Sequence, residues 1–253
     1  MDGVSNEGRN RALAEFCDDR SATYRLIAAL VDREVDAARA QAIVQMGRGM
    51  DEAARADMRQ DAPEGAESDE RALRARMADA ARRMADEAAA FDKAAEDRLA
   101  CDFARIFLAA GNTPDNDKTA VPFESVYTSE SGLMMQEARD EVRAVFRAEG
   151  IMPARTGVDG EIPDDYLPFE LEYLALLGER AAEALRAGSS DRARALAEKQ
   201  RGFLRDHVLN WTESLAAAVK DFEECGFYGA LMDFACAFFA DDARALDEML
   251  ASW

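Results

Sequence analysis

The sequence contains a single histidine, His207, among 253 residues, and this scarcity excludes several kinds of catalytic site. Helical di-iron sites need two Glu-x-x-His pairs and two further glutamates, which one histidine cannot supply. No HExxH, GxxxxGK[ST] or GxGxxG motif occurs. A Ser-His-Asp arrangement would depend on His207, but this residue shares a helical face with Leu204 and Trp211, and no elbow motif supplies the serine. We therefore interpret His207 as a core or rim residue and expect no metal, no cofactor and no enzymatic activity.

Cysteine, proline and long apolar runs are scarce as well. Six prolines and few β-branched residues disfavour an all-β fold. No run of about 18 apolar residues occurs, and the N-terminus has no apolar signal segment, so we expect a cytoplasmic protein without stable membrane insertion. The cysteines form no CxxC pair and lie in apolar helical patterns, which favours buried thiols over disulfides or a zinc site. They are Cys17, Cys101, Cys225 and Cys236.

Positive charge is outnumbered, with 31 Lys and Arg residues against 51 Asp and Glu residues and a net charge of −20. Nucleic acids and anionic membranes are themselves polyanions, so this excess excludes them as nonspecific partners. The charge suits a cationic partner. The alternative is that it only keeps the protein soluble.

Helical periodicity dominates the remaining sequence and predicts an all-α protein, a single globular helical domain of about ten helices. Residues 1–100 form an N-terminal helical part that contains an Ala/Arg/Glu-rich insertion and an exposed linker near residues 61–68. Residues 101–253 form the core helical part, which we expect to be continuous with the first. Among the later helices we predict segments at about 131–149, 191–200, 203–224, 226–240 and 242–252.

One acidic and apolar stretch, EIPDDYLPFELEYLALLGER at residues 161–180, predicts a central helix that begins close to Asp165. A proline at position 168 is tolerated only in the first turn of such a helix. Its apolar stripe consists of Leu167, Leu171, Leu174, Leu177 and Leu185. Three glutamates, Glu172, Glu179 and Glu183, fall on the opposite side.

Three carboxylates of this stretch have two interpretations each. Glu170 lies within the apolar stripe, where a carboxylate must be paired or hydrogen-bonded. It either forms a structural salt bridge, with Arg105 or Arg143, or lines a groove. Asp164 and Asp165 either cap the first turn of the helix or contact a partner.

Several spaced motifs share one order with a known family. They are DFARIFLAAG, AVPFESVYTSESGLMMQEARDEVRAVFRAEGI, EIPDDYLPFELEYLALL, FLRDHVLNWTESLAAAV and FYGALMDFACAFFADD. From about Cys101 to Asp242 the chain thereby resembles the TorD/DmsD/NarJ family of cytoplasmic maturation chaperones for molybdoenzymes. The resemblance implies an all-helical protein that binds the twin-arginine signal peptide of a partner reductase and holds the apoenzyme until its molybdenum cofactor is inserted.

The resemblance also points to particular residues. The family pattern Asp-His-Leu-x-x-Glu-Leu is matched except at Tyr166, which stands where histidine is usual and does not titrate near neutral pH. The other matches are Asp165, Leu167, Glu170 and Leu171 in this pattern, Pro122, Ser125, Val126 and Tyr127 in the Pro-x-x-Ser-Val-Tyr loop, and His207 with Trp211 in the His-x-x-x-Trp pair. Arg105 belongs to the first motif.

An acidic protein with carboxylates beside an apolar groove complements a leader peptide that has a basic and an apolar segment. We expect Asp164, Asp165 and Glu170 to contact the cationic segment. Phe123, Tyr127 and Tyr166, with Pro122 and Ser125 beside them, would form the rest of the peptide site. The predicted partners are the twin-arginine leader and the apo catalytic subunit of a molybdoenzyme, with the protein as monomer or dimer. A general helical adaptor and a carboxylate-based enzyme are the alternatives.

Overall fold

The computed structural model describes residues 6–57, 68–110, 120–152, 156–157 and 160–253, and this part of the chain is all-α, as predicted. It contains ten helices and one hairpin of two-residue strands. The helices are α1 (Asn6–Asp32), α2 (Ala37–Asp57), α3 (Ser68–Ala88), α4 (Lys93–Phe107), α5 (Glu124–Thr128), α6 (Glu137–Ala148), α7 (Leu167–Arg186), α8 (Ser190–His207), α9 (Thr212–Phe222) and α10 (Phe227–Ala251). The strands are β1 (Thr156–Gly157) and β2 (Gly160–Glu161), which pair antiparallel.

The described residues pack into two compact units that each combine distant parts of the sequence. The first unit comprises Met1–Ala29, Phe123–Asn210 and Asp242–Trp253, and the second comprises Leu30–Pro122 and Trp211–Asp241. The division near residue 100 stays a prediction. The linker near 61–68 lies outside the described residues except at Ser68, where α3 begins.

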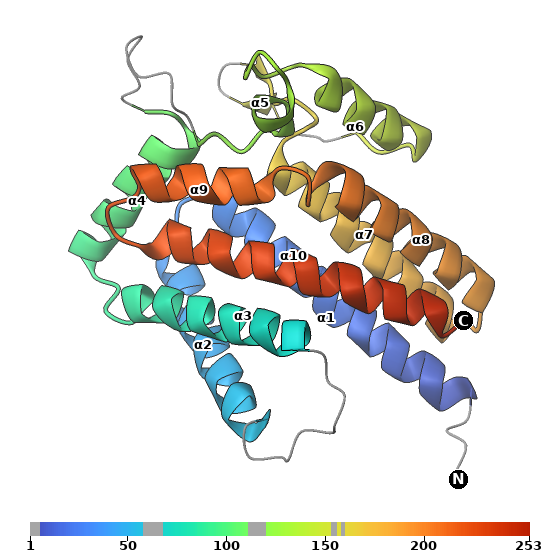
Figure 1. Cartoon of the computed structure of the whole chain (residues 1–253). Helices are drawn as coiled ribbons and strands as arrows, with labels where there is room; N and C mark the ends of the chain where they lie inside the picture. The colour runs from blue at the N-terminus through green and yellow to red at the C-terminus, as the bar shows by residue number, and fades with distance from the viewer. Residues whose placement is uncertain (1–5, 58–67, 111–119, 153–155, 158–159) are drawn as a thin grey trace. The chain divides into compact units, whose positions relative to one another are not determined.

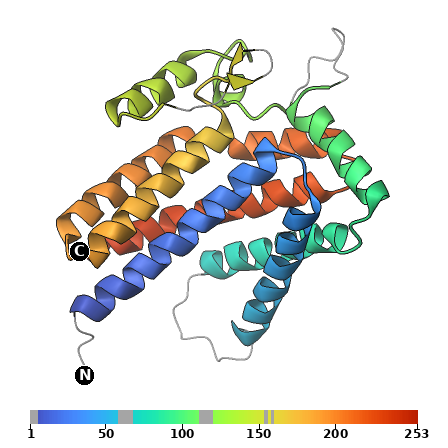
Figure 2. The ribbon, with the colours of Figure 1, turned by 180° about the vertical axis from the view of Figure 1, so that it is seen from behind.

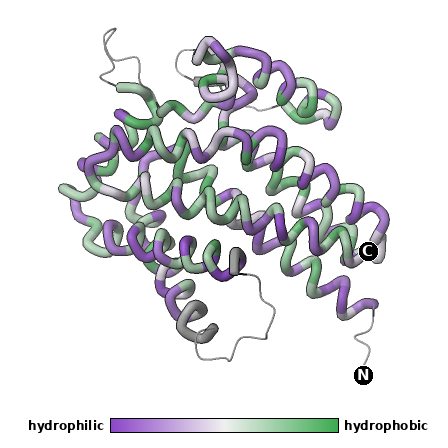
Figure 3. Tube along the Cα trace, viewed as in Figure 1, coloured by the Kyte–Doolittle hydropathy of each residue, from purple (hydrophilic) through white to green (hydrophobic). Residues whose placement is uncertain are grey.

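Helix α7 is the central helix of the first unit and lies beside α8, as Figures 1 and 2 show from opposite sides. The predicted leucine stripe is confirmed, since each of its five leucines is buried. Glu172 and Glu183 are exposed, as expected for the polar side. Hydrophilic and hydrophobic residues alternate along the helices, the pattern that amphipathic helices require (Figure 3).

Helix α1 packs closely on α7 at Gly178. A Cβ atom at this position would lie 2.3 Å from Ser21 Oγ and 3.4 Å from the carbonyl oxygen of Cys17. A side chain would therefore push the two helices apart, and glycine allows their close approach.

The C-terminal part of α10 belongs to the first unit and is joined to α1 by a buried ion pair. Asp242 accepts hydrogen bonds from the guanidinium of Arg20, one of them at 2.8 Å, and from the hydroxyl of Tyr24 at 2.6 Å. Arg20 also donates to Gln200 of α8 at 2.9 Å. Every group in this cluster is nearly inaccessible to solvent, so the cluster fixes how three helices meet.

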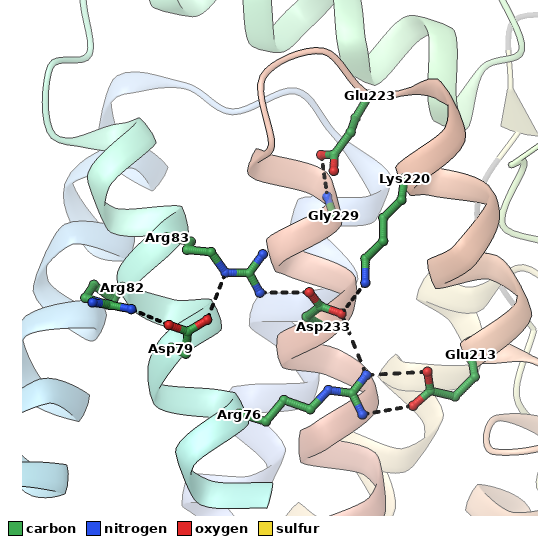
Figure 4. A network of polar contacts seen from close by, with 9 residues as sticks. All are labelled: Arg76, Asp79, Arg82, Arg83, Glu213, Lys220, Glu223, Gly229 and Asp233. Carbon is green, nitrogen blue, oxygen red and sulfur yellow. Dashed lines mark hydrogen bonds and ion pairs between the residues drawn. The ribbon is translucent and has the colours of Figure 1, made fainter. Parts of the chain in front are cut away.

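In the second unit, α2 and α3 pack against each other, and ion pairs join α3 to α9 and α10 (Figure 4). Asp233 accepts hydrogen bonds from Arg83 and Lys220, each at 2.7 Å, and lies 3.7 Å from Arg76. Arg76 also donates to Glu213 of α9 at 3.2 and 3.4 Å. The carboxylate of Asp233 on α10 thus forms ion pairs with cationic side chains of both α3 and α9.

Several predicted boundaries are wrong. The helices predicted at 191–200 and 203–224 are broken at 208–211 instead, because α8 continues through Gly202 to His207. The segments 226–240 and 242–252 form one helix, α10, because Asp242 binds Arg20 rather than capping a new helix. Helix α6 begins at Glu137, six residues after the predicted start. Among the cysteines, Cys17 and Cys236 are buried, Cys225 is half-buried and Cys101 is exposed, which contradicts the prediction for Cys101.

Candidate functional site

The start of α7 is held to the start of α5 by the carboxylate of Asp165. Helix α7 begins at Leu167, and Tyr166 is its N-cap without a side-chain capping bond, so the prediction that Asp164 or Asp165 caps this helix is wrong. Asp165 Oδ2 instead accepts hydrogen bonds from the backbone N–H of Ser125, at 2.9 Å, and from its hydroxyl. The carboxylate therefore serves the first turn of α5, which lies 40 residues earlier in the chain.

Backbone and ring contacts strengthen this junction. The N–H of Glu124 donates to the carbonyl oxygen of Asp165 at 3.0 Å, and Phe123 and Tyr166 form an isolated antiparallel bridge. Their rings lie 5.1 Å apart, and the ring of Tyr166 meets that of Phe169 edge to face at 5.3 Å. Tyr166 is thus largely buried among aromatic rings.

A second buried carboxylate, Glu124, holds the end of α8 to the same junction. Its Oε2 lies 3.0 Å from Nδ1 of His207, and its Oε1 accepts a hydrogen bond from the side-chain amide of Asn210 at 2.8 Å. Glu124 is 2% exposed and His207 is 8% exposed. His207 is thus buried beside a buried carboxylate, which fits its interpretation as a core or rim residue.

The environment of Asp165 disfavours its charge. Its Oδ1 atom is buried and has no hydrogen-bond partner in the described part of the chain. Burial raises the pKa of the Asp165 carboxyl, and the nearby charge of Glu124 adds to the rise, while the bonds from Ser125 oppose it without cancelling it. The folded protein therefore holds a proton on Asp165 more tightly than the unfolded chain does.

Replacing Asp165 by asparagine is expected to change how stability depends on pH. Because the folded pKa is raised, the wild-type protein loses stability as the pH rises from about 4, the unfolded value, through the folded value. The Asp165→Asn variant carries no charge at this position and lacks that loss. Melting temperatures measured from pH 4 to pH 7 should show the variant gaining on the wild type as the pH rises. A difference in melting temperature that stays constant or shrinks as the pH rises would contradict the raised pKa of Asp165.

The remaining predicted acidic residues lie in different surroundings. Asp164 is 19% exposed, and its Oδ2 lies 3.8 Å from Nε of Arg139 and of Arg143, distances longer than a hydrogen bond. Glu170 is fully buried. Arg105, one of the two partners considered for it, lies 2.7 Å from Glu224 in the second unit.

The structure therefore brings together part of the predicted set. Phe123, Ser125, Asp165 and Tyr166 meet at one junction, and Asp164 is adjacent in the chain. Phe123 and Tyr127 are half-buried, and burial raises the pKa of the Tyr127 hydroxyl. Pro122, Trp211 and Arg105 belong to the second unit, where Pro122 and Trp211 are buried. The roles of all these residues stay predictions.

Sequence reasoning missed Glu124 and Asn210. Glu124 stands between two motif residues in PFESVY, and Asn210 lies between the motif residues His207 and Trp211. A signal was available, because an acidic residue between Phe123 and Ser125, in an apolar segment, needs a buried donor. His207, one of the motif residues, can supply such a donor.

Two kinds of site are missing from the described residues. No group of three or more His, Cys, Asp or Glu side chains there is arranged to hold a metal ion. In the same part of the chain, no helix is both long enough and apolar enough to cross a membrane. At the junction between α5 and α7, two buried carboxylates, Asp165 and Glu124, and the partly exposed carboxylate of Asp164 lie near aromatic rings.

Comparison with known proteins gives a family and several relatives. The family model described as nitrate reductase delta subunit matches residues 70–217. Proteins named chaperone protein TorD match as well, from Vibrio cholerae serotype O1 with 30% identity over 60% of this chain and 64% of the relative, and from Photobacterium profundum with 30% identity over 58% and 63%. The chain thus spans less than two thirds of the length of these relatives.

The family match covers more than half of the chain and includes the Pro-x-x-Ser-Val-Tyr loop, the start of α7 and the His207–Trp211 pair. The TorD relatives agree with the resemblance that the motifs carry. The chain belongs to the nitrate reductase delta subunit family, in which the TorD/DmsD/NarJ motifs place it.

Proposed function

We propose that this protein is a cytoplasmic chaperone that binds the twin-arginine leader and the apo form of a molybdopterin oxidoreductase, aids cofactor insertion and delays export. The observation that carries the proposal is the family match over residues 70–217, together with relatives named chaperone protein TorD. The net charge of −20 supports it, because a twin-arginine leader is basic at one end.

Asp164 is our choice for the contact with the leader's arginines. It is partly exposed, and its two arginine neighbours lie at 3.8 Å, too far to occupy its oxygens with hydrogen bonds. A peptide guanidinium can approach such a carboxylate and form the shorter, two-pronged bond that arginine prefers.

The buried residues act by holding the site in shape. Asp165 and Ser125 fix the start of α5, and Tyr166 packs between Phe123 and Phe169. Glu170 lies fully buried on α7, one turn after Tyr166. Phe123 and Tyr127, which are half-buried, supply the apolar side of the contact. Pre-organisation of this kind lowers the entropy lost when a flexible leader binds.

Calorimetric titration tests the proposal. The probe is the leader peptide of a molybdopterin oxidoreductase from the same organism, compared with a variant in which its paired arginines are lysines. We expect the native leader to bind and the lysine variant to bind roughly 10-fold more weakly, because lysine lacks the planar fork of arginine. Absence of binding by both peptides would refute the function, and equal binding would refute paired-arginine recognition.

A substitution at Asp164 locates the contact. The Asp164→Asn protein should lose roughly 10-fold in affinity for the native leader with an unchanged melting temperature, since it removes the charge and keeps the shape. The matched control is Glu183→Gln, an exposed carboxylate on the polar side of α7, the helix that follows Asp164, and this variant should leave the affinity unchanged. Equal losses of affinity in the two variants would show that Asp164 attracts the leader only through nonspecific electrostatics and forms no direct contact with it.

A further inference from the structure

The loop between α5 and α6 exposes three consecutive large apolar side chains. Leu133, Met134 and Met135 are 62%, 45% and 56% exposed. Single exposed apolar residues are ordinary on protein surfaces, but contiguous ones mark interaction sites. Half of the six exposed large apolar residues in the described part of the chain are concentrated in this one triplet, which we call the apolar loop.

Hydrogen bonds fix the backbone of the apolar loop. The N–H of Leu133 donates to Ser131 Oγ at 3.4 Å, and the side-chain amide of Gln136 donates to the carbonyl oxygen of Met134 at 3.0 Å. The N–H of Gln136 donates to Ser125 Oγ at 3.2 Å, and this hydroxyl also bonds to Asp165. The loop is therefore anchored to the junction at the start of α7 while its apolar side chains stay exposed.

The backbone itself carries strain at the same place. Met135 has a φ of 62°, in the left-handed region that side chains other than glycine rarely adopt. Such strain persists only where the surroundings enforce it, and it is concentrated at binding sites.

The charges around the apolar loop decide which partner fits it. Glu130, Glu137, Asp140 and Glu141 flank the loop in sequence and are exposed. The cation nearest to the loop in the sequence is Arg139, which pairs with Asp140 at 2.9 Å. A second copy of this chain and an anionic membrane would both be repelled by this rim and by the net charge of −20. A peptide that is apolar over one stretch and basic beside it is complementary in both respects.

We propose that the apolar loop binds the apolar stretch of the leader peptide, while the flanking carboxylates face its basic segment. This inference rests on the proposed function and adds a second contact to the one at Asp164. Methionine suits the task, because its flexible and polarisable side chain adapts to apolar partners of varied shape. The bonds from Gln136 to Ser125 and from Ser125 to Asp165 couple this contact to the start of α7.

The test is a double-mutant cycle measured by calorimetry on the full chain. One protein variant carries Leu133→Ser, Met134→Ser and Met135→Ser, and a second carries Met134→Ser alone. The matched control is Met152→Ser, which removes a side chain that is 85% exposed beyond the other end of α6. The probes are the native leader and a leader whose apolar stretch has its leucines replaced by serines, with the paired arginines kept.

We expect the triple variant to bind the native leader roughly 10-fold or more weakly, with an unchanged melting temperature, and the single variant to lose less. The Met152→Ser protein should bind as the wild type does. The serine-substituted leader should bind the wild type and the triple variant alike, because the contact is already lost.

Two results overturn the inference, and they are distinguishable. If the wild type and both loop variants bind the native leader equally, the apolar loop does not contact the leader, and the proposed function stands. Failure of the wild type to bind the leader refutes the proposed function and, with it, the occupant assigned to the loop.

Discussion

Replacing Asp242 by alanine is expected to lower the free energy of unfolding by about 3–5 kcal/mol. The substitution leaves the guanidinium of Arg20 buried without its counter-ion and deprives the hydroxyl of Tyr24 of its acceptor. Both side chains of the ion pair are nearly inaccessible to water, 5% exposed for Arg20 and 1% for Asp242, so solvent cannot replace the lost partner. Chemical denaturation followed by circular dichroism measures the change.

An exposed ion pair on α1, the helix that carries Arg20, provides the control. Arg11→Ala removes the partner of Glu15, and both side chains are mostly exposed, so its cost should stay below about 0.5 kcal/mol. The double variant Arg20→Met with Asp242→Leu should be more stable than Asp242→Ala, because no uncompensated charge remains. A loss below about 1 kcal/mol for Asp242→Ala would show that the buried pair does not fix α10 to α1.

Replacing Glu124 by alanine is expected to destabilise the protein by about 1–3 kcal/mol, since two side-chain donors, one buried and one on an exposed residue, lose their acceptor. These donors are the ring N–H of His207 and the side-chain amide of Asn210. The Glu124→Gln variant keeps one acceptor oxygen and should lose less. Denaturant titration of the three proteins measures the order of their stabilities.

The control for this series is Glu130→Ala, an exposed glutamate just beyond α5, which should change stability by less than about 0.5 kcal/mol. A Glu124→Ala protein as stable as Glu130→Ala would contradict the buried cluster. Equal losses for Glu124→Ala and Glu124→Gln would show that the negative charge, and not the number of acceptors, matters to His207 and Asn210.

The sequence predicts what depends on local periodicity. The leucine stripe of α7 is read directly from a spacing of three and four residues, and its burial follows from the hydrophobic effect. The all-α class follows from the same periodicity repeated along the chain. The order of spaced motifs leads to the family, because agreement over many positions carries information that no single motif has.

The errors concern residues whose partners lie far away in the sequence. Asp165 has the right position to cap α7, but it binds Ser125, and a contact over 40 residues leaves no periodic signal. Asp242 is a residue type that often begins a helix, but its partner Arg20 lies 222 residues away and α10 continues through it. Tertiary partners thus override local preference at these aspartates.

In the candidate site, too, burial depends on distant partners that the sequence pattern does not reveal. Asp164 and Asp165 are adjacent in the sequence, but the first is partly exposed and the second is fully buried, a distinction that only the packing of α5 creates. Helix α5 is five residues long and too short for a periodic signal, which hides Glu124 as well.

The proposed chaperone function is tested most directly by the affinity of the full chain for a leader-bearing catalytic subunit. This affinity is measured with the subunit in its apo form and again after the molybdenum cofactor has been inserted. The account predicts that the apo subunit binds and that the loaded subunit binds roughly 10-fold or more weakly, since a chaperone must release a finished client. Equal affinity for both forms, or no affinity for either, would contradict it.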